Sequence, residues 1–194
     1  MATKHRELLD FVSKHGVLRG RFVLSSGRES AYYIDGKMVT FSPEGLRLTI
    51  AAIRKELAPF EFDAIGGRDM GATPIAAAYA VLSPTEGRRC DAFTVRKEVK
   101  GHGSRKRIEG PLRANAKVAI VDDVVTTGAS IVDAIEAVQA EGCRVVAAVT
   151  LVDRAAGAAE ELARLGIPYH PLLTIADLGL SDDANRSSPL AATA

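Results

Sequence analysis

Apolar residues along this chain follow two rhythms, which alternate over most of its length. Short, continuous apolar runs rich in β-branched residues, such as 145–152, are typical of strands buried on both faces of a sheet. Stretches with apolar residues at helical spacing, such as 129–141, are typical of helices that cover such a sheet. We therefore predict an α/β fold in which helices flank a mostly parallel central sheet. Strands are expected at 64–66, 91–96, 117–122, 145–152 and 169–175, and helices at 42–57, 73–82, 129–141 and 155–165.

The N-terminal part of the chain is organised differently. Apolar residues at helical spacing between Leu8 and Val12 predict a helix that Gly16 ends. Two short runs of β-branched and aromatic residues, 22–24 and 31–34, flank a turn and predict a pair of strands. We expect three regions. Residues 1–41 contain the N-terminal helix and this hairpin, and they are here called the hood. Residues 42–180 form the core, and residues 181–194 form a small, polar, disordered tail.

The composition is that of an ordinary globular protein, and it narrows the function mainly by exclusion. Hydrophobic residues make up 47% of the 194 positions and charged residues 25%, which is enough apolar material for a full core. A formal net charge of +1 provides no global field for nucleic acid or for an anionic membrane. Cys90 and Cys143 lie far apart without a CxxC spacing, so neither a disulfide scaffold nor a zinc ribbon is expected. Because the N-terminus is polar and no apolar run could span a bilayer, we expect a soluble, cytoplasmic protein that binds neither membrane nor nucleic acid.

The strongest chemical signal is the segment that joins the apolar strand 117–122 to the helix that begins at Ala129. Ligands of open α/β sheets bind beyond the carboxyl ends of the strands, and a helix N-terminus offers N–H groups and a positive dipole to a phosphate. Hydroxyl side chains and a glycine suit a phosphate there. The two acids would repel a phosphate, and they suit ribose hydroxyls or a metal ion that bridges the ribose. This segment, here called the cradle, consists of Asp122, Asp123, Val124, Val125, Thr126, Thr127, Gly128, Ala129 and Ser130.

Other phosphate-binding loops do not fit the cradle. No Gly-Lys-Ser/Thr follows, which excludes a Walker loop, and the Gly-x-Gly-x-x-Gly of a dinucleotide site is missing. An ordinary strand followed by a capped helix, with the acids merely solvated, is the other interpretation. The order of two acids, two threonines, a glycine and a serine behind an apolar strand resembles the phosphoribosyl diphosphate signature of the type I phosphoribosyltransferases. In that family the two acids contact the ribose hydroxyls and the following turn binds the 5-phosphate.

A second segment, 96–107, is strongly basic and contains glycines that favour mobility. Such a loop can close over a diphosphate, exclude water and neutralise the charge of the leaving group. Taken alone, it is equally typical of a solvated loop that touches nucleic acid. Its sequence RKEVKGHG resembles the catalytic loop of orotate phosphoribosyltransferases. The resemblance implies a homodimer in which the loop reaches into the neighbouring site, diphosphate binding by Arg96, Lys97, Lys100 and His102, and a catalytic role for Lys100 and Asp123.

Three further features bear on the base and the diphosphate. Residues 22–37 of the hood, with Ser-Gly-x-x-Ser and a pair of aromatic residues, resemble the base pocket of the same enzymes. Many members carry a lysine where this chain has Ser25, so that role is missing or passes to Lys37. A simple hairpin with core tyrosines is the alternative. The glycine-rich turn 65–74 occupies the position of the family's diphosphate loop. Arg154 matches the residue that pairs with the orotate carboxylate, the alternative being a surface salt bridge to Asp153.

Together these resemblances imply a defined reaction. Orotate and phosphoribosyl diphosphate would give orotidine 5′-phosphate and diphosphate, a step of de novo pyrimidine biosynthesis. Thr126 and Arg154 are then expected to position orotate, and Mg²⁺ to act as cofactor, held mostly by substrate and water rather than by protein ligands. Two other interpretations stay open: a transferase that salvages another base, and a ligand-sensing regulator that uses the same fold and binds nucleic acid.

Overall fold

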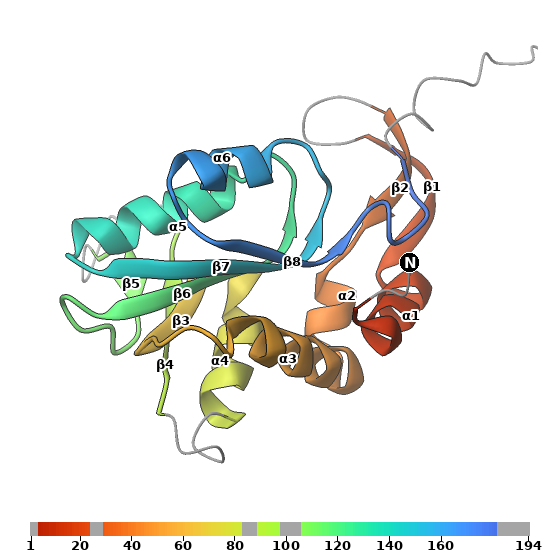
Figure 1. Cartoon of the computed structure of the whole chain (residues 1–194). Coiled ribbons are helices and arrows are strands. Elements are labelled where there is room, and N and C mark those ends of the chain that lie inside the picture. The colour runs from red at the N-terminus through yellow and green to blue at the C-terminus, as the bar shows by residue number, and fades with distance from the viewer. Residues whose placement is uncertain (1–3, 24–28, 83–88, 98–105, 182–194) are drawn as a thin grey trace, which may run out of the picture.

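A six-stranded, mostly parallel sheet forms the centre of the structure, a computed structural model that describes residues 4–23, 29–82, 89–97 and 106–181 (Figure 1). The strand order is β5-β4-β3-β6-β7-β8, and every neighbouring pair is parallel except β4 and β5. The predicted fold class is therefore confirmed. The strands are β3 (Ala64–Arg68), β4 (Asp91–Val95), β5 (Ile108–Glu109), β6 (Lys117–Val125), β7 (Arg144–Asp153) and β8 (Tyr169–Thr174).

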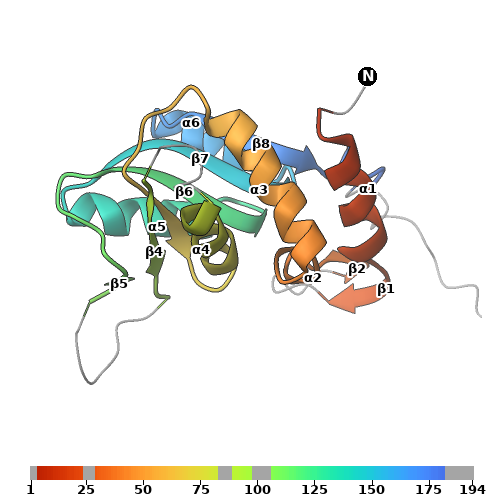
Figure 2. The same ribbon diagram turned by 90° about the horizontal axis from the view of Figure 1, so that it is seen from below.

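Helices cover both faces of this sheet (Figures 1 and 2). One face carries α3 (Pro43–Leu57) and α4 (Ala72–Leu82), and the other carries α5 (Ala129–Ala140) and α6 (Ala158–Arg164). Val121 of β6 packs in the cluster that contains α3 and α4, whereas Ile120 packs in the cluster with α5 and α6. Both side chains are fully buried, and each such burial contributes about 1.5–3 kcal/mol. The central strands are continuously apolar because both of their faces are covered. None of the helices in the described part of the chain is long and apolar enough to cross a membrane.

The N-terminal unit packs against one end of this core (Figure 1). It consists of α1 (Arg6–His15), β1 (Val17–Val23), β2 (Glu29–Ile34) and α2 (Lys37–Thr40), and β1 and β2 form a separate antiparallel sheet. Leu8 and Val12 of α1 and Tyr32 of β2 are buried in the same cluster as α3 and α4. The hood is therefore held in a fixed position relative to the sheet by shared apolar packing.

Several elements differ from the prediction, for local physical reasons. β1 begins at Val17, well before the expected residue 22, and most of it is exposed. Backbone pairing with β2 holds it, so no apolar alternation marks it in the sequence. β5 and α2 are too short to show a period. α6 begins at Ala158 because Gly157, at φ 114°, precedes it in the left-handed conformation. The expected turn at 25–28 and the tail from 182 lie outside the described residues.

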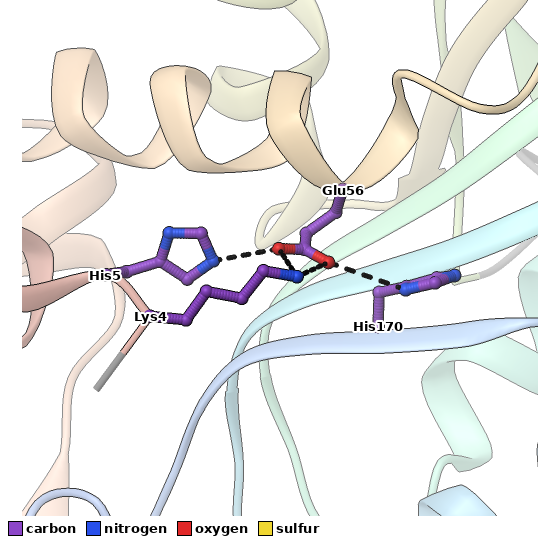
Figure 3. A network of polar contacts seen from close by, with 4 residues as sticks. All are labelled: Lys4, His5, Glu56 and His170. Carbon is purple, nitrogen blue, oxygen red and sulfur yellow. Dashed lines mark hydrogen bonds and ion pairs between the residues drawn. The ribbon is translucent and has the colours of Figure 1, made fainter. Parts of the chain in front are cut away.

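A buried carboxylate ties the N-terminus to the core (Figure 3). Glu56, near the end of α3, is only 8% exposed and lies between three basic side chains. Lys4 Nζ is 2.7 Å and His5 Nε2 is 3.0 Å from Glu56 Oε1, and His170 Nδ1 of β8 is 3.6 Å from Oε2. Burial alone would raise the pKa of Glu56, but the hydrogen bonds from Lys4 and His5 outweigh it and lower the pKa.

The strand order reverses between β3 and β6. Ile65 of β3 pairs with Ala92 of β4 on one side and with Ala119 of β6 on the other. Beside β3 the sheet continues with β4 and β5, and beside β6 it continues in the opposite direction with β7 and β8. Open α/β sheets bind their ligands at such a reversal, beyond the carboxyl ends of the strands. The segments that leave β3 and β6 are therefore where a site is expected.

Candidate active site

Two adjacent acids lie at the carboxyl end of β6. The strand was expected to end at Asp122 but continues to Val125, so Asp123 also belongs to the strand itself. Their exposed fractions are 6% and 7%. Adjacent carboxylates that are merely solvated would stand open to water, and this alternative is therefore wrong. Burying a charge in this way is costly, which is typical of a functional site.

Asp122 points toward the helix that follows the cradle. Its Oδ2 accepts a hydrogen bond of 2.7 Å from the Ser130 hydroxyl, and its Oδ1 accepts one of 2.9 Å from the Asp123 N–H. Burial is the main cause that raises the pKa of Asp122 to about 7, and the neighbouring Asp123 charge adds to it, while the Ser130 hydrogen bond opposes it. Ser130 therefore orients Asp122 in this structure.

Asp123 is held from two sides. Its Oδ1 accepts a hydrogen bond of 2.8 Å from the Val124 N–H, and its Oδ2 lies 3.7 Å from Nζ of Lys37. A methyl group added at Gly36 would lie 2.8 Å from Asp123 Cβ, so the hood backbone touches this acid directly. From the sequence, Lys37 was expected only as a substitute for the lysine missing at Ser25, and no role was expected for Gly36. Ser25 lies outside the described residues.

The turn after the acids has the features of a phosphate site. Thr126 and Thr127 are exposed, and Gly128 takes a left-handed φ of 84°. Gly128 also lies close to α6, since an added Cβ would be 3.1 Å from Ala158 Cα. Gly128 is the N-cap residue of α5 and has no side chain that could cap the helix, and the first N–H groups of α5 have no partner within the helix. This arrangement suits an anion of the size of a phosphate monoester.

The glycine-rich turn after β3 meets the same acids. A methyl group on Gly71 would collide with Oδ1 of both Asp122 and Asp123. The backbone of this turn therefore closes over the two carboxylates, as expected for a turn at the strand reversal. The signal for Gly71 in the sequence was the glycine-rich character of 65–74, without any indication of which glycine makes the contact.

The basic segment is described at its two ends only. The backbone N–H of Arg96 donates to the Arg107 carbonyl at 2.8 Å, and the guanidinium of Arg96 lies 2.9 Å from Glu109 Oε1. Arg107 in turn lies 2.7 Å from Asp133 of α5, the helix that begins at the cradle. Arg96 thus pairs with Glu109 in this structure, and Lys97 is exposed. Lys100 and His102 lie outside the described residues.

Arg154 lies where the core meets the hood. Its guanidinium carbon is 5.6 Å from the centre of the Tyr32 ring, a cation–π distance, and its backbone N–H donates to the Val125 carbonyl at 2.9 Å. Asp153 is buried, and its Oδ1 accepts a hydrogen bond from the Ala155 N–H. The structure therefore brings Arg154 and Tyr32 together beside the carboxyl end of β6.

Among the described residues, no group of three or more histidine, cysteine and acidic side chains is arranged to hold a metal ion. The oxygens of Asp122 and Asp123 are the hard donors that Mg²⁺ prefers. They are already engaged by Ser130, Lys37 and backbone N–H groups. With these partners in place, the pair can offer a magnesium ion only a small part of its oxygen ligands.

The chain is similar to known phosphoribosyltransferases. Residues 45–164 match the phosphoribosyl transferase domain family. The chain is 41% identical to an orotate phosphoribosyltransferase of Corynebacterium glutamicum over 93% of its length and 96% of that protein. It is 43% identical to one from Nostoc sp., with coverage of 92% and 86%.

Solved structures agree. The orotate phosphoribosyltransferase of Mycobacterium tuberculosis with Fe(III) dicitrate superposes with a TM-score of 0.82 at 40% identity, covering 91% of this chain and 99% of that one. The same enzyme with phosphoribosyl diphosphate superposes with a TM-score of 0.78 at 39% identity and the same coverage. The fold and site thus define a phosphoribosyltransferase. Within that class, the chain belongs to the orotate phosphoribosyltransferase family.

Proposed function

We propose that this chain transfers the 5-phosphoribosyl group from phosphoribosyl diphosphate to orotate, giving orotidine 5′-phosphate and diphosphate in de novo pyrimidine biosynthesis. The observation that carries this function is the buried acid pair beside the uncapped start of α5. Relatives of that name match nearly the whole chain, and one of them has been solved with phosphoribosyl diphosphate. The chain is thus a pentosyltransferase.

The cradle binds and orients the sugar donor. The N–H groups at the start of α5, with the hydroxyls of Thr126 and Thr127, bind the 5-phosphate. Asp122 and Asp123 accept hydrogen bonds from the ribose hydroxyls, and their negative charge favours the cationic character that the ring gains as its C1–O bond breaks. The remaining cradle residues, Val124, Val125, Gly128, Ala129 and Ser130, shape the turn.

The acceptor is fixed from the opposite side. Arg154 offers a planar fork to the orotate carboxylate and Thr126 a hydroxyl to the base, so that the attacking nitrogen faces C1. The Arg154 guanidinium lies against Tyr32 of the hood, which supports its orientation. Positioning of this kind converts binding energy into rate without a covalent intermediate.

The leaving diphosphate is neutralised by the basic segment. Arg96, Lys97, Lys100 and His102 bind it, and Lys100 contributes most to turnover. Arg96 has to exchange its partner Glu109 for the diphosphate when substrate binds. Mg²⁺, when bound, screens the charge of the same phosphate oxygens. His102 is a hydrogen-bond donor in this scheme, without acid–base work.

We further propose that the protein works as a cytoplasmic homodimer that shares its basic loop between subunits. Cys90 and Cys143 are buried thiols that donate to backbone carbonyls, as is usual in a reducing compartment. Mixing the Lys100→Ala and Asp123→Asn variants tests the sharing. A hybrid dimer then has one intact site, and about a quarter of the wild-type rate per site returns. If each loop served its own subunit, no activity would return.

The function itself is tested with a panel of bases. Purified protein, phosphoribosyl diphosphate and Mg²⁺ should consume orotate, followed by ultraviolet absorbance. Turnover of adenine, guanine or xanthine in place of orotate would keep the class and refute the substrate. Nucleic-acid binding in a gel-shift assay without turnover of any base would instead favour a regulator.

A further inference from the structure

Lys37 belongs to the hood and lies next to the acid pair of the core. It is the first residue of α2, and its Nζ lies 3.7 Å from Oδ2 of Asp123. The lysine side chain is 50% exposed, whereas that of Asp123 is 10% exposed. An ion pair of this kind, half in water, is worth little for folding. We therefore expect the main effect of this ion pair to be on the orientation of the Asp123 carboxylate.

The backbone around Lys37 is fixed tightly against the acid. The Lys37 N–H donates to Asp35 Oδ1 at 3.1 Å, and the Asp35 N–H donates to the Gly16 carbonyl at 2.8 Å. Gly36 fits against Asp123 so closely that an added methyl group would lie 2.8 Å from Oδ2. The lysine therefore approaches the carboxylate from an anchored position, and only its flexible stem can vary.

The two oxygens of Asp123 have different restraints. Oδ1 accepts the Val124 N–H at 2.8 Å, which fixes one side of the carboxylate. Oδ2 faces the Lys37 cation. Because the preceding residue, Asp122, also has a buried carboxyl, the positive charge of Lys37 offsets the repulsion between two acids at this point.

We propose that Lys37 is a positioning residue for the transfer reaction: it holds the Asp123 carboxylate in the orientation that meets the ribose. This inference rests on the proposed function. It gives the hood a second role beside enclosing the base, because Lys37 belongs to the hood and acts on a residue of the core. It also differs from a direct substitute for the lysine missing at Ser25, which would contact substrate.

Variants of Lys37 distinguish a positioning role from direct contact with substrate. In Lys37→Met the aliphatic stem stays and the cation is lost, so kcat should fall about tenfold while KM for orotate and for phosphoribosyl diphosphate stays within about twofold. Lys37→Arg keeps a cation and should restore kcat to within about twofold of the wild type. A rise in either KM with unchanged kcat would mean that Lys37 contacts substrate directly, and it would overturn the inference. Unchanged kinetics would do the same.

A double-mutant cycle asks whether Lys37 acts through Asp123. Rates are measured in single turnover at high enzyme concentration, so that slow variants can be followed. In the Asp123→Asn background, Lys37→Met should change the rate by no more than about twofold, since the carboxylate it positions is gone. Multiplicative effects of the two substitutions would refute a role through Asp123.

Lys117→Met is the matched control. Lys117 is also 50% exposed and lies 3.9 Å from a carboxylate, that of Glu61, but at the amino end of β6. Its removal should leave kcat unchanged. Failure of the wild type to use orotate would refute the proposed function. Orotate turnover by the wild type with a fully active Lys37→Met would refute only the positioning role.

Discussion

Gly36→Ala perturbs the contact between the hood and the acid pair without straining the backbone. Gly36 has a φ of −60° and a ψ of −26°, which alanine adopts freely. The new methyl group would lie 2.8 Å from Cβ and from Oδ2 of Asp123, and 2.9 Å from Cγ2 of Val124. Ordinary contact begins at 3.4 Å, so these groups must separate by 3.4 − 2.8 = 0.6 Å.

The expected loss follows from this displacement. Overpacking of this size costs about 1–3 kcal/mol of stability. A catalytic group misplaced by about 1 Å can cost about a hundredfold in rate, so a 0.6 Å shift of Asp123 should lower kcat by about ten- to a hundredfold. The assay combines steady-state turnover of orotate with thermal unfolding, so that activity is compared at a temperature where both proteins are folded.

Leu57→Ala supplies the control for lost stability alone. Leu57 is the last residue of α3 and is 1% exposed, next to Glu56, which pairs with His170 near the amino end of β8. Truncation of a buried leucine costs about 2–5 kcal/mol of stability. This variant should unfold at a lower temperature while its kcat, measured where it is folded, stays unchanged. A wild-type kcat in Gly36→Ala would refute the expected displacement of Asp123, and so would an equal loss of kcat in Leu57→Ala.

Three further variants have distinct signatures. Asp122→Asn should unfold at a higher temperature than the wild type at pH 8 and lose activity. The pKa of Asp122 is raised from 3.8 to about 7, so this group costs stability increasingly as pH rises through that interval, and the difference should vanish near pH 4. Glu56→Gln should lower stability by about 1–3 kcal/mol at pH 7. Because the pKa of Glu56 is lowered below its usual 4.5, the stability that it contributes is present above pH 4.5 and lost as pH falls through the folded pKa, so melting curves of the two proteins should converge in acid. Lys100→Ala should depress turnover strongly without changing the melting temperature, and normal turnover would remove the basic loop from the mechanism.

Much of the fold could be predicted because the core strands carry a local signal. β7 is apolar from Val145 to Val152 except at Thr150, and β6 is apolar from Val118 to Val121, because both faces of these strands are covered. The cradle could be predicted because its polar residues follow that strand in unbroken order. The Ser130 hydroxyl was expected to suit a phosphate, whereas in this structure it donates to Asp122.

Contacts between distant segments could not be predicted in the same way. Lys37 and Gly36 contact Asp123 although α3, β3 and α4 are among the elements that separate them in the sequence. No residue pattern indicates a contact between segments so far apart in the chain. β1 carries no apolar period because its pairing with β2, rather than burial, holds it. The pairing of Arg96 with Glu109 depends on a two-residue strand, β5, that is too short for any periodic signal.

Joining orotate to the ribose of phosphoribosyl diphosphate is the activity on which every role described above depends. The most direct test is to incubate purified protein with radiolabelled orotate, phosphoribosyl diphosphate and Mg²⁺ and to identify the product chromatographically. We expect labelled orotidine 5′-phosphate together with an equal amount of diphosphate, and loss of both products in Asp123→Asn. This expectation would be contradicted if orotate were recovered unchanged while a purine base in the same assay was converted to its nucleotide.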